Sequence, residues 1–341
     1  MADVQVNIMM FGGRRCGKTS ILAAMQSCFR EAFQGSNLFI TAEDNDTMNA
    51  INDKENELRD YFNDRGQYFF PDNNPSFDLS HHRFKISLKN RDTDSIVLDF
   101  VDYPGEWIDK NAGKQEELTE IMRGSHVVII AIDSPHLMEE VPQGAAVGRY
   151  NNRRNYCYIF EQWSQNFLQS GAVNLPAKMI LFVPLKCEKY FQEKEMDVLN
   201  ERVREAYKDT LNFFTGNAQP YEVAITPILT LGCVKFARFA RNEKGDIDLD
   251  SKFSTPTRPI YKFTKRDAQP EPRYCEQPAV YVLAYLLRIL SQQQRSIFDW
   301  LRTFFGNFAS TEDFIREYEN VRARMKKNGE GYQIVSNPLR F

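Results

Sequence analysis

Residues 4–33 decide the fold: VQVNIMMF (4–11) leads into GGRRCGKTS (12–20), and ILAAMQSCFREAF (21–33) follows. The first stretch is an apolar run typical of a buried strand, and the last has the apolar spacing of a helix. The stretch between them fits the motif G-x-x-x-x-G-K-[ST], which is informative when a strand precedes it and a helix follows it. The sequence therefore predicts a phosphate-binding loop between a strand and a helix.

The residue types of this loop suit a polyphosphate. Gly12 and Gly17 allow the backbone to curl, so that successive N–H groups and the positive end of the next helix surround phosphate oxygens. Lys18 brings a positive charge to the β- and γ-phosphates, and the Thr19 hydroxyl is a ligand for Mg²⁺. A glycine turn with an exposed lysine is the alternative. The other nucleotide-binding candidates in this loop are Gly13, Arg14, Arg15, Cys16 and Ser20.

Arginines occur in this loop and again in a stretch that contains Gly and Pro. We interpret the side chains of Arg14 and Arg15 as solvent-exposed, with contact to the phosphates as the alternative. Arg149, Arg153 and Arg154 lie in the second stretch. A solvated basic loop is the favoured interpretation there. An arginine finger, which offsets charge during phosphoryl transfer, is the alternative.

Composition excludes several classes of protein. The chain has 341 residues, 42% hydrophobic and 26% charged, and its net charge of −3 gives no reason to expect a nucleic-acid partner. Its six cysteines include no C-x-x-C pair, so neither a zinc site nor a disulfide framework is expected. No apolar run reaches transmembrane length, and a strand begins too early to leave room for a signal peptide. We expect a cytoplasmic protein without a membrane span.

A second motif ends another expected strand. Residues 83–89 alternate apolar and polar side chains, and 95–101 is expected to pair back as the second strand of a hairpin. The segment LDFVDYPGEW (98–107) then places Asp102 at the carboxyl end of a strand, three residues before Gly105. Asp102 is a candidate for the magnesium shell, while Gly105 offers an N–H to a γ-phosphate and gives the loop a hinge.

Hydrolysis and nucleotide sensing need further residues. Glu106 would lie beside the attacking water, so Lys18 and Glu106 are the candidate catalytic residues. The segment that senses the γ-phosphate should lie before the hairpin, where Ser76 and Ser80 are available. No spacing singles out either serine, and a plain surface serine is an equal alternative for each.

The loop 12–19 together with the segment DYPG (102–105) resembles the translation-factor and Ras-like GTPases of the TRAFAC clade. The string GRRCGKTS (13–20) is similar to the phosphate loops of Rag/Gtr GTPases, and the motif set also resembles the bacterial double-GTPase group. The resemblance covers roughly residues 4–235 and rests on short motifs. It implies GTP and GDP as ligands and Mg²⁺ as the cofactor.

The expected base-reading loop departs from the pattern of this clade. Such GTPases place N/T-K-x-D after a buried strand, where the acid accepts hydrogen bonds from guanine and the lysine stem covers the base. After the expected strand 177–184, this chain has LKCE (185–188). Lys186 matches, the amide is missing at Leu185, and Glu188 is one methylene longer than aspartate. Adenine is an alternative base, and a charged turn without base contact is another alternative.

We expect a three-layer α/β P-loop NTPase fold with a mixed, mostly parallel sheet. Residues 1–290 would form the GTPase-like domain, with insertions at about 36–80, 134–155 and 235–274, and residues 291–341 a helical C-terminal extension. Within the domain, 193–214 is expected as one long helix and 222–231 as a strand interrupted by Pro227.

The sequence favours a magnesium-dependent GTP-binding molecular switch that hydrolyses GTP to GDP and phosphate, slowly or with a partner's help. The expected partners are guanine nucleotide and a protein effector or activator, and the sequence is compatible with an oligomer. A nucleotide-binding interaction protein without turnover is one alternative, since the catalytic glutamine is absent. A P-loop ATPase is the other, on account of Leu185 and Glu188.

Overall fold

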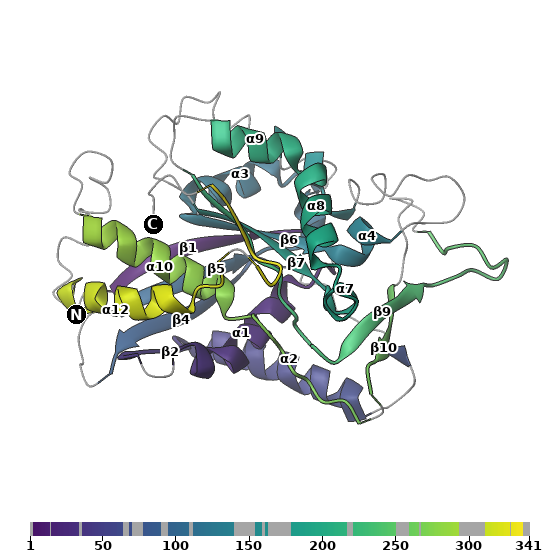
Figure 1. The fold of residues 1–341 in the computed structure, drawn as a ribbon, viewed down its shortest axis with the longest axis horizontal. Coiled ribbons are helices and arrows are strands. Elements are labelled where there is room, and N and C mark those ends of the chain that lie inside the picture. The colour runs from purple at the N-terminus through teal and green to yellow at the C-terminus, as the bar shows by residue number, and fades with distance from the viewer. Residues whose placement is uncertain are drawn as a thin grey trace.

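An eight-stranded sheet forms the centre of the computed structural model (Figure 1). Its strands lie in the order β11 (Gln333–Ser336), β8 (Glu222–Ile225), β7 (Met179–Leu185), β6 (Val127–Asp133), β1 (Asp3–Phe11), β5 (Ser95–Asp102), β4 (Ser80–Leu88) and β2 (Leu38–Ala42). The five strands from β8 to β5 are parallel, whereas β11, β4 and β2 pair antiparallel to their neighbours. The mixed, mostly parallel sheet expected from the sequence is confirmed.

The structure describes residues 3–13, 15–33, 36–63, 68–69, 78–89, 95–108, 112–139, 154–158, 161–162, 179–216, 221–249, 259–265, 267–292, 311–327 and 329–336. Among the residues in these ranges, no helix is both long and apolar enough to cross a bilayer. Arg14, Ser76, Arg149 and Arg153, which the sequence singled out, lie outside them.

Helices cover both faces of the sheet and make three layers (Figure 1). One face carries α1 (Lys18–Ala32), α10 (Gln277–Gln292) and α12 (Thr311–Arg324), with α2 (Asn45–Asn63) beyond α1. The other face carries α3 (Gln115–Gly124), α8 (Met196–Ala206) and α9 (Lys208–Gly216). Shorter helices among the described residues include η1 (Gly105–Ile108), α4 (Ser134–Met138) and α7 (Glu188–Gln192).

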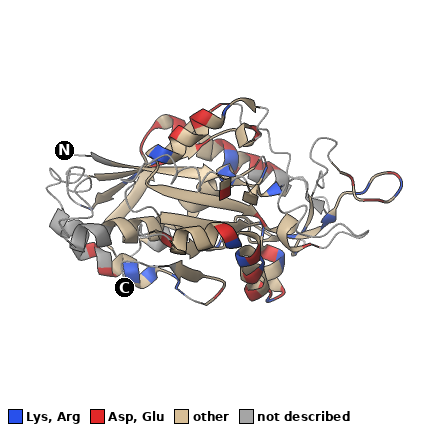
Figure 2. Ribbon diagram, turned by 90° about the horizontal axis from the view of Figure 1, so that it is seen from above, with Lys and Arg blue, Asp and Glu red and all other residues tan. Residues whose placement is uncertain are grey.

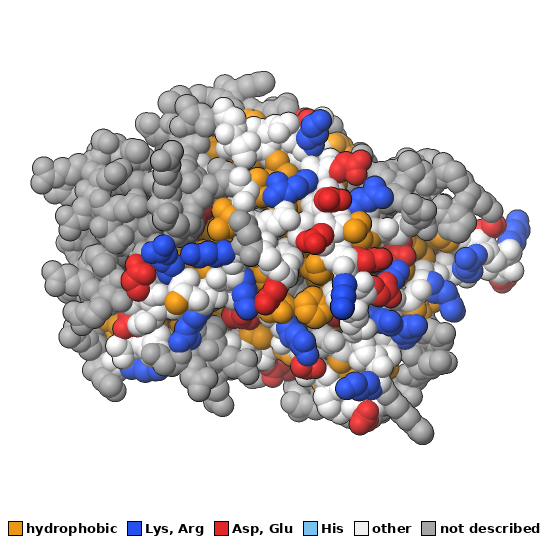
Figure 3. Space-filling model, in the orientation of Figure 1, with side chains coloured by type: hydrophobic (Ala, Val, Ile, Leu, Met, Phe, Trp, Pro, Cys, Tyr) orange, Lys and Arg blue, Asp and Glu red, His pale blue; other side chains and the backbone are white. Residues whose placement is uncertain are grey.

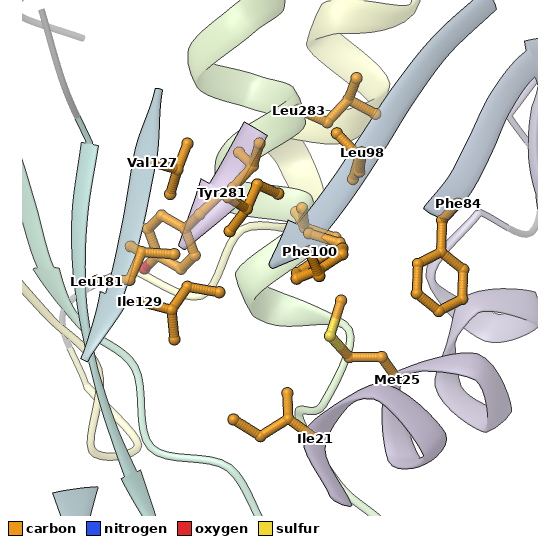
Figure 4. Packing of buried hydrophobic residues seen from close by; sticks show 14 of the residues in the cluster. Ile21, Met25, Phe84, Leu98, Phe100, Val127, Ile129, Leu181, Tyr281 and Leu283 are labelled. Carbon is orange, nitrogen blue, oxygen red and sulfur yellow. The ribbon is translucent and has the colours of Figure 1, made fainter. Parts of the chain in front are cut away.

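The core on the α1 side shows how the phosphate loop is held in place. Ile21 and Met25 of α1 point towards the sheet, where Phe100 and Ile129 lie, and Tyr281 of α10 approaches from beside them (Figure 4). All five side chains are fully or almost fully buried. Burying a large apolar side chain stabilises the fold by about 1.5–3 kcal/mol. This packing fixes the first helix, and with it the loop that precedes the helix, against the sheet.

The carboxyl ends of the parallel strands meet at one edge of the sheet. The strand β1 lies between β5 and β6, and β7 follows β6. In open parallel sheets, ligands bind outside the carboxyl ends of the strands, where loops from adjacent strands converge. A functional site is therefore expected among the loops that follow β1, β5, β6 and β7.

A second, three-stranded sheet has the order β3 (Tyr68–Phe69), β10 (Pro259–Phe263) and β9 (Val234–Phe239). It combines the insertions expected at about 36–80 and 235–274, and Phe62 and Phe236 belong to its apolar cluster. After β9, the described residues 240–249 project away from the body and include charged residues (Figures 1 and 2). Its tip turns at Asn242–Asp246, where Asn242 N donates to Asp246 O at 2.8 Å, as a hairpin tip requires.

The C-terminal region is not only helical. The strand β11 pairs antiparallel with β8, with Ile334 opposite Ala224, and so extends the main sheet. Tyr332 is fully buried just before this strand, and the Asn200 amide donates to Gly331 O at 2.9 Å. A four-residue strand after a glycine turn has no distinctive pattern in the sequence, which explains why it was not expected.

Two further elements differ from expectation. The long helix expected at 193–214 is two helices, α8 and α9, that meet at Tyr207 with φ −112° and ψ 23°. The buried Tyr207 ring packs against Phe182, and its hydroxyl donates to Asn155 O at 3.4 Å, so tertiary contacts override helix propensity here. The strand expected at 222–231 ends at Ile225, before Pro227.

The described part of the face in Figure 3 mixes lysine and arginine with aspartate and glutamate, with no extended patch of one sign.

Candidate functional site

The phosphate loop joins β1 to α1 at the carboxyl edge of the sheet. It begins at Gly12, directly after β1, and ends where α1 starts at Lys18. Gly17 has φ +109°, which side chains rarely adopt. A Cβ atom on Gly12 would lie 2.8 Å from Cys16 Sγ and 3.2 Å from the Ala131 carbonyl oxygen. A side chain would therefore be strained at Gly17 by the backbone conformation and would press on Cys16 and Ala131 at Gly12.

The Lys18 ammonium lies over the loop that precedes it. Its Nζ atom donates to Gly12 O at 2.9 Å and to Gly13 O at 3.4 Å, and it lies 3.8 Å from Asp102 Oδ1. The side chain is only 7% exposed. A buried positive charge thus stands at the N-terminus of α1, where the helix dipole also favours an anion.

Thr19 and Asp102 connect the two sequence motifs. The Thr19 hydroxyl donates to Asp102 Oδ2 at 2.8 Å, and the Asp102 side chain is 2% exposed. Because β5 runs parallel to β1, with Val101 opposite Met9, the carboxylate reaches the start of α1. Within the described part of the chain, Asp102 Oδ1 is buried without a hydrogen-bond partner. A hydroxyl and a carboxylate with an unused oxygen are hard ligands that fit Mg²⁺.

The loop after β5 adds Tyr103, which sequence reasoning missed. Gly12 N donates to the Tyr103 hydroxyl at 3.4 Å, and Lys18 Nζ lies 5.3 Å from the centre of the ring. Burial raises the pKa of Tyr103 well above its ordinary value, so the phenol stays protonated. The ring also stacks on Trp107 in η1. No motif identifies a tyrosine between the acid and the glycine of such a loop.

Gly105 and Glu106 are the first residues of η1, so both lie next to Asp102 along the chain. Gly105 is buried and Glu106 half-buried. Ser80, at the start of β4, lies beside the same loop: its hydroxyl donates to Asp102 O at 3.3 Å and is 3.3 Å from His82 Nε2. The structure therefore brings Ser80, one of the two serines considered for nucleotide sensing, beside the site, while Ser76 lies outside the described residues.

The loop after β7 contacts the phosphate loop through Lys186. This residue has φ +58°, and its Nζ atom donates to Arg15 O at 2.8 Å and to Asp133 Oδ2 at 2.7 Å. Glu188, the acid that was expected to read the base together with Lys186, is 4% exposed. Its Oε1 atom accepts hydrogen bonds from Leu231 N at 3.2 Å and from Gly232 N at 3.3 Å.

Burial raises the pKa of Glu188 above its ordinary value, although the two N–H donors and Lys186 oppose this. The bonds from Leu231 and Gly232 tie the acid to the segment 230–233, which follows β8. Three segments thus lie together at one edge of the sheet: the phosphate loop, the loop after β7 that carries Lys186 (the lysine loop), and the segment 230–233.

Arg154 lies beside this edge, with its Nε atom 3.7 Å from Asp133 Oδ2 and the side chain 19% exposed. It is therefore paired with a buried carboxylate, and not a residue of a freely solvated basic loop. Sequence reasoning missed Asp133 and its neighbour His136, because an aspartate at the end of an apolar strand matches no motif.

A central parallel strand that runs into a glycine–lysine loop, with a carboxylate from the next strand bonded to the loop threonine, defines the class of P-loop NTPases. The family is equally clear. The chain belongs to the Double-GTPase 2 family, whose model matches residues 7–226. That range includes the phosphate loop, Asp102, Lys186 and Glu188, and it confirms the resemblance to the double-GTPase group.

Solved structures add distant similarities. The S. cerevisiae Ski7 GTPase-like domain bound to GDP and inorganic phosphate is 13% identical with a TM-score of 0.37, over 75% of this chain and 48% of that one. The same domain bound to GTP is 12% identical with a TM-score of 0.35, over 67% and 43%. The chain thus spans less than half the length of these structures. None of the curated proteins matches it.

Proposed function

We propose that the protein is a magnesium-dependent GTPase that binds GTP, hydrolyses it to GDP and phosphate, and acts as a molecular switch. The observation that carries this proposal is the hydrogen bond of 2.8 Å between Thr19 and Asp102, directly beside the buried Lys18 ammonium. It joins two motifs that are 83 residues apart in the chain. Membership of the Double-GTPase 2 family supports guanine as the base.

The phosphate loop binds the polyphosphate in this proposal. Backbone N–H groups of the phosphate loop and the N-terminus of α1 would surround the β-phosphate, and Lys18 would neutralise charge on the β- and γ-phosphates. Thr19 and Asp102 would hold Mg²⁺, which neutralises the charge that develops on the transferred phosphoryl group. Lys18 leaves its carbonyl partners Gly12 and Gly13 and moves onto the phosphate oxygens.

The loop that follows Asp102 responds to the γ-phosphate. Gly105 offers its N–H and a hinge, and Glu106 orients the attacking water. A carboxylate close to a triphosphate is repelled by it, so turnover is expected to be slow unless a protein activator contributes. Replacing Glu106 by Gln would keep the water contact and remove the repulsion. We expect single-turnover hydrolysis of GTP to persist in Glu106→Gln. A complete loss of hydrolysis in this variant would assign Glu106 to proton transfer.

The loop after β7 reads the base. The aliphatic stem of Lys186 covers one face of it, and Glu188 accepts hydrogen bonds from guanine while it holds Leu231 and Gly232 in place. Glu188→Gln tests this assignment, since the amide oxygen still accepts from both N–H groups. Xanthine has a carbonyl oxygen where guanine has its 2-amino group, so a Gln amide suits xanthine and a carboxylate suits guanine. We expect the variant to prefer XTP over GTP.

Hydrolysis is tested by single-turnover phosphate release from GTP and from ATP, with Mg²⁺, in the wild type and in Lys18→Ala. Release from GTP that Lys18→Ala abolishes supports the GTPase. Equal or faster release from ATP would contradict guanine specificity and favour a P-loop ATPase. Tight binding of GTP without release would instead identify a nucleotide-binding interaction protein.

A further inference from the structure

Asp133 is the last residue of β6, and its side chain is fully buried. It lies opposite Leu185 in the register of β6 with β7, so it faces the loop that carries Lys186. Asn155 fixes its backbone, since Asp133 N donates to Asn155 Oδ1 at 2.7 Å. The carboxylate is thus held at the meeting point of the phosphate loop and the lysine loop.

The Lys186 ammonium connects these two loops. Its Nζ atom donates both to Asp133 Oδ2 at 2.7 Å and to Arg15 O, in the phosphate loop, at 2.8 Å. Leu185, which stands where the clade has an amide, contributes only apolar contact: its Cδ1 atom would lie 3.4 Å from a Cβ placed on Gly17. Asp133 and Lys186 therefore supply a polar connection between the two loops.

The charges around Asp133 favour an ionised carboxylate. Burial acts against ionisation, but the positive charges of Lys186 and Arg154 and the hydrogen bond from His136 outweigh it and hold the pKa of Asp133 well below its ordinary range. His136 Nδ1 lies 2.8 Å from Asp133 Oδ1, and burial lowers the pKa of His136, so a neutral imidazole donates this bond. The two carboxylate oxygens therefore have separate tasks: Oδ1 binds His136 and Oδ2 binds Lys186.

We propose that Asp133 is a positioning residue for the nucleotide site, which holds the Lys186 ammonium on the Arg15 carbonyl and thereby fixes the lysine stem against the bound base. The inference rests on the proposed function, because it assigns Lys186 to the base. It goes beyond that function by naming a buried residue, Asp133, that sets nucleotide affinity through Lys186. Asp133 touches neither the nucleotide nor the reacting atoms in this account.

A role in folding alone makes a different prediction. If Asp133 only satisfied buried partners, removal of the His136 contact would be as damaging to nucleotide binding as removal of the Lys186 contact. His136→Asn is the matched control, because the shorter side chain removes the imidazole bond to Asp133 Oδ1 and leaves the bond from Lys186 to Oδ2 in place, and His136 has no contact with the phosphate loop among the described residues.

The experiment measures dissociation of a fluorescent guanine nucleotide from the full chain with Mg²⁺. The variants are Asp133→Asn, Lys186→Met, the double variant and His136→Asn, and thermal unfolding without nucleotide is recorded for each. We expect Asp133→Asn and Lys186→Met each to speed dissociation about tenfold, which corresponds to about 1.4 kcal/mol. The double variant should be no more than about twofold faster than either, because both changes break one connection. His136→Asn should stay within about twofold of the wild type, and hydrolysis at saturating GTP should change little in Asp133→Asn.

Additive effects in the double variant, or equal losses in His136→Asn and Asp133→Asn that follow their melting temperatures, would overturn the inference and leave the proposed function intact. If the wild type instead bound ATP more tightly than GTP, the proposed function would fail, and the same cycle measured with an ATP analogue would still decide the role of Asp133. Binding of neither nucleotide to the wild type would overturn both.

Discussion

Gly232 gives the sharpest structural prediction, because a methyl group there has no space. The residue has φ +69°, and a Cβ atom would lie 1.8 Å from the Glu271 carbonyl oxygen, a distance that no side chain tolerates. Glu271 N donates to Leu231 O at 2.8 Å, and Arg273 N to Leu229 O at 2.9 Å, so displacement of this segment breaks backbone hydrogen bonds.

The expected loss of stability in Gly232→Ala has two contributions, the left-handed backbone conformation and the broken backbone hydrogen bonds. An alanine in a left-handed conformation costs about 1–2 kcal/mol. Each broken backbone hydrogen bond costs about 1 kcal/mol, and two or three are at risk around Gly232. We therefore expect Gly232→Ala to lower the free energy of unfolding by about 3–5 kcal/mol. Gly245→Ala is the matched control, since Gly245 has φ +84° but nothing within 4 Å of its Cβ position, and it should lose only about 1–2 kcal/mol.

Equilibrium unfolding in urea, followed by circular dichroism, measures both variants under one set of conditions. Because Gly232 N also donates to Glu188, guanine nucleotide should bind more weakly to Gly232→Ala than to Gly245→Ala. Equal unfolding midpoints for the two variants would refute the reasoning, because they would show that the Glu271 carbonyl does not press on residue 232.

Three further predictions concern the site. Thr19→Val removes the hydrogen bond to Asp102 and should lower the free energy of unfolding by about 2 kcal/mol, whereas Thr19→Ser keeps the hydroxyl and should lower it much less. Urea unfolding in nucleotide-free buffer compares the two variants. Equal losses would mean that the hydroxyl is dispensable. Burial lowers the pKa of His82 and His136 in the folded state, so the unfolded chain binds more protons below pH 6.5. Stability should then fall as the pH drops from 6.5, by at most about 1.4 kcal/mol per pH unit for each histidine, and replacing both by Asn should flatten the profile in unfolding measured from pH 7.5 to 5.5. Tyr103→Phe removes the acceptor for the Gly12 N–H and should cost about 1 kcal/mol, and an unchanged thermal midpoint would argue against that bond.

The sequence allowed the centre of the site to be predicted because its determinants are local. A strand, a glycine-rich loop and a helix that follow one another directly can take few arrangements, so the positions of Gly12, Gly17 and Lys18 follow from their order. Asp102 could be placed because it ends a strand that must pair near the first one. The observed distances between Thr19, Lys18 and Asp102 agree with that placement.

The features that were missed depend on contacts between distant segments. The strand β11 has four residues and is fixed by its pairing with β8, which no local pattern announces. The small sheet draws on two insertions that are far apart in sequence. Tyr207 ends a helix through its ring packing against Phe182. Asp133 acquires its importance only when the fold brings Lys186, His136 and Arg154 around it.

The lysine loop lies between these two cases. Lys186 could be recognised from the order of strands, but Leu185 and Glu188 departed from the expected motif. The structure shows Leu185 packed beside Gly17 and Glu188 bonded to the backbone of Leu231 and Gly232. A longer acid that reaches a neighbouring loop is a change of geometry, which sequence spacing alone does not reveal.

The most direct test of the central claim is equilibrium binding of GTP and ATP to the purified full chain in the presence of Mg²⁺, with Lys18→Ala as the control. We expect GTP to bind more tightly than ATP and Lys18→Ala to weaken GTP binding strongly, because the phosphate loop then loses its buried positive charge. Tighter binding of ATP, or GTP binding that is unchanged in Lys18→Ala, would contradict a guanine nucleotide site in this loop.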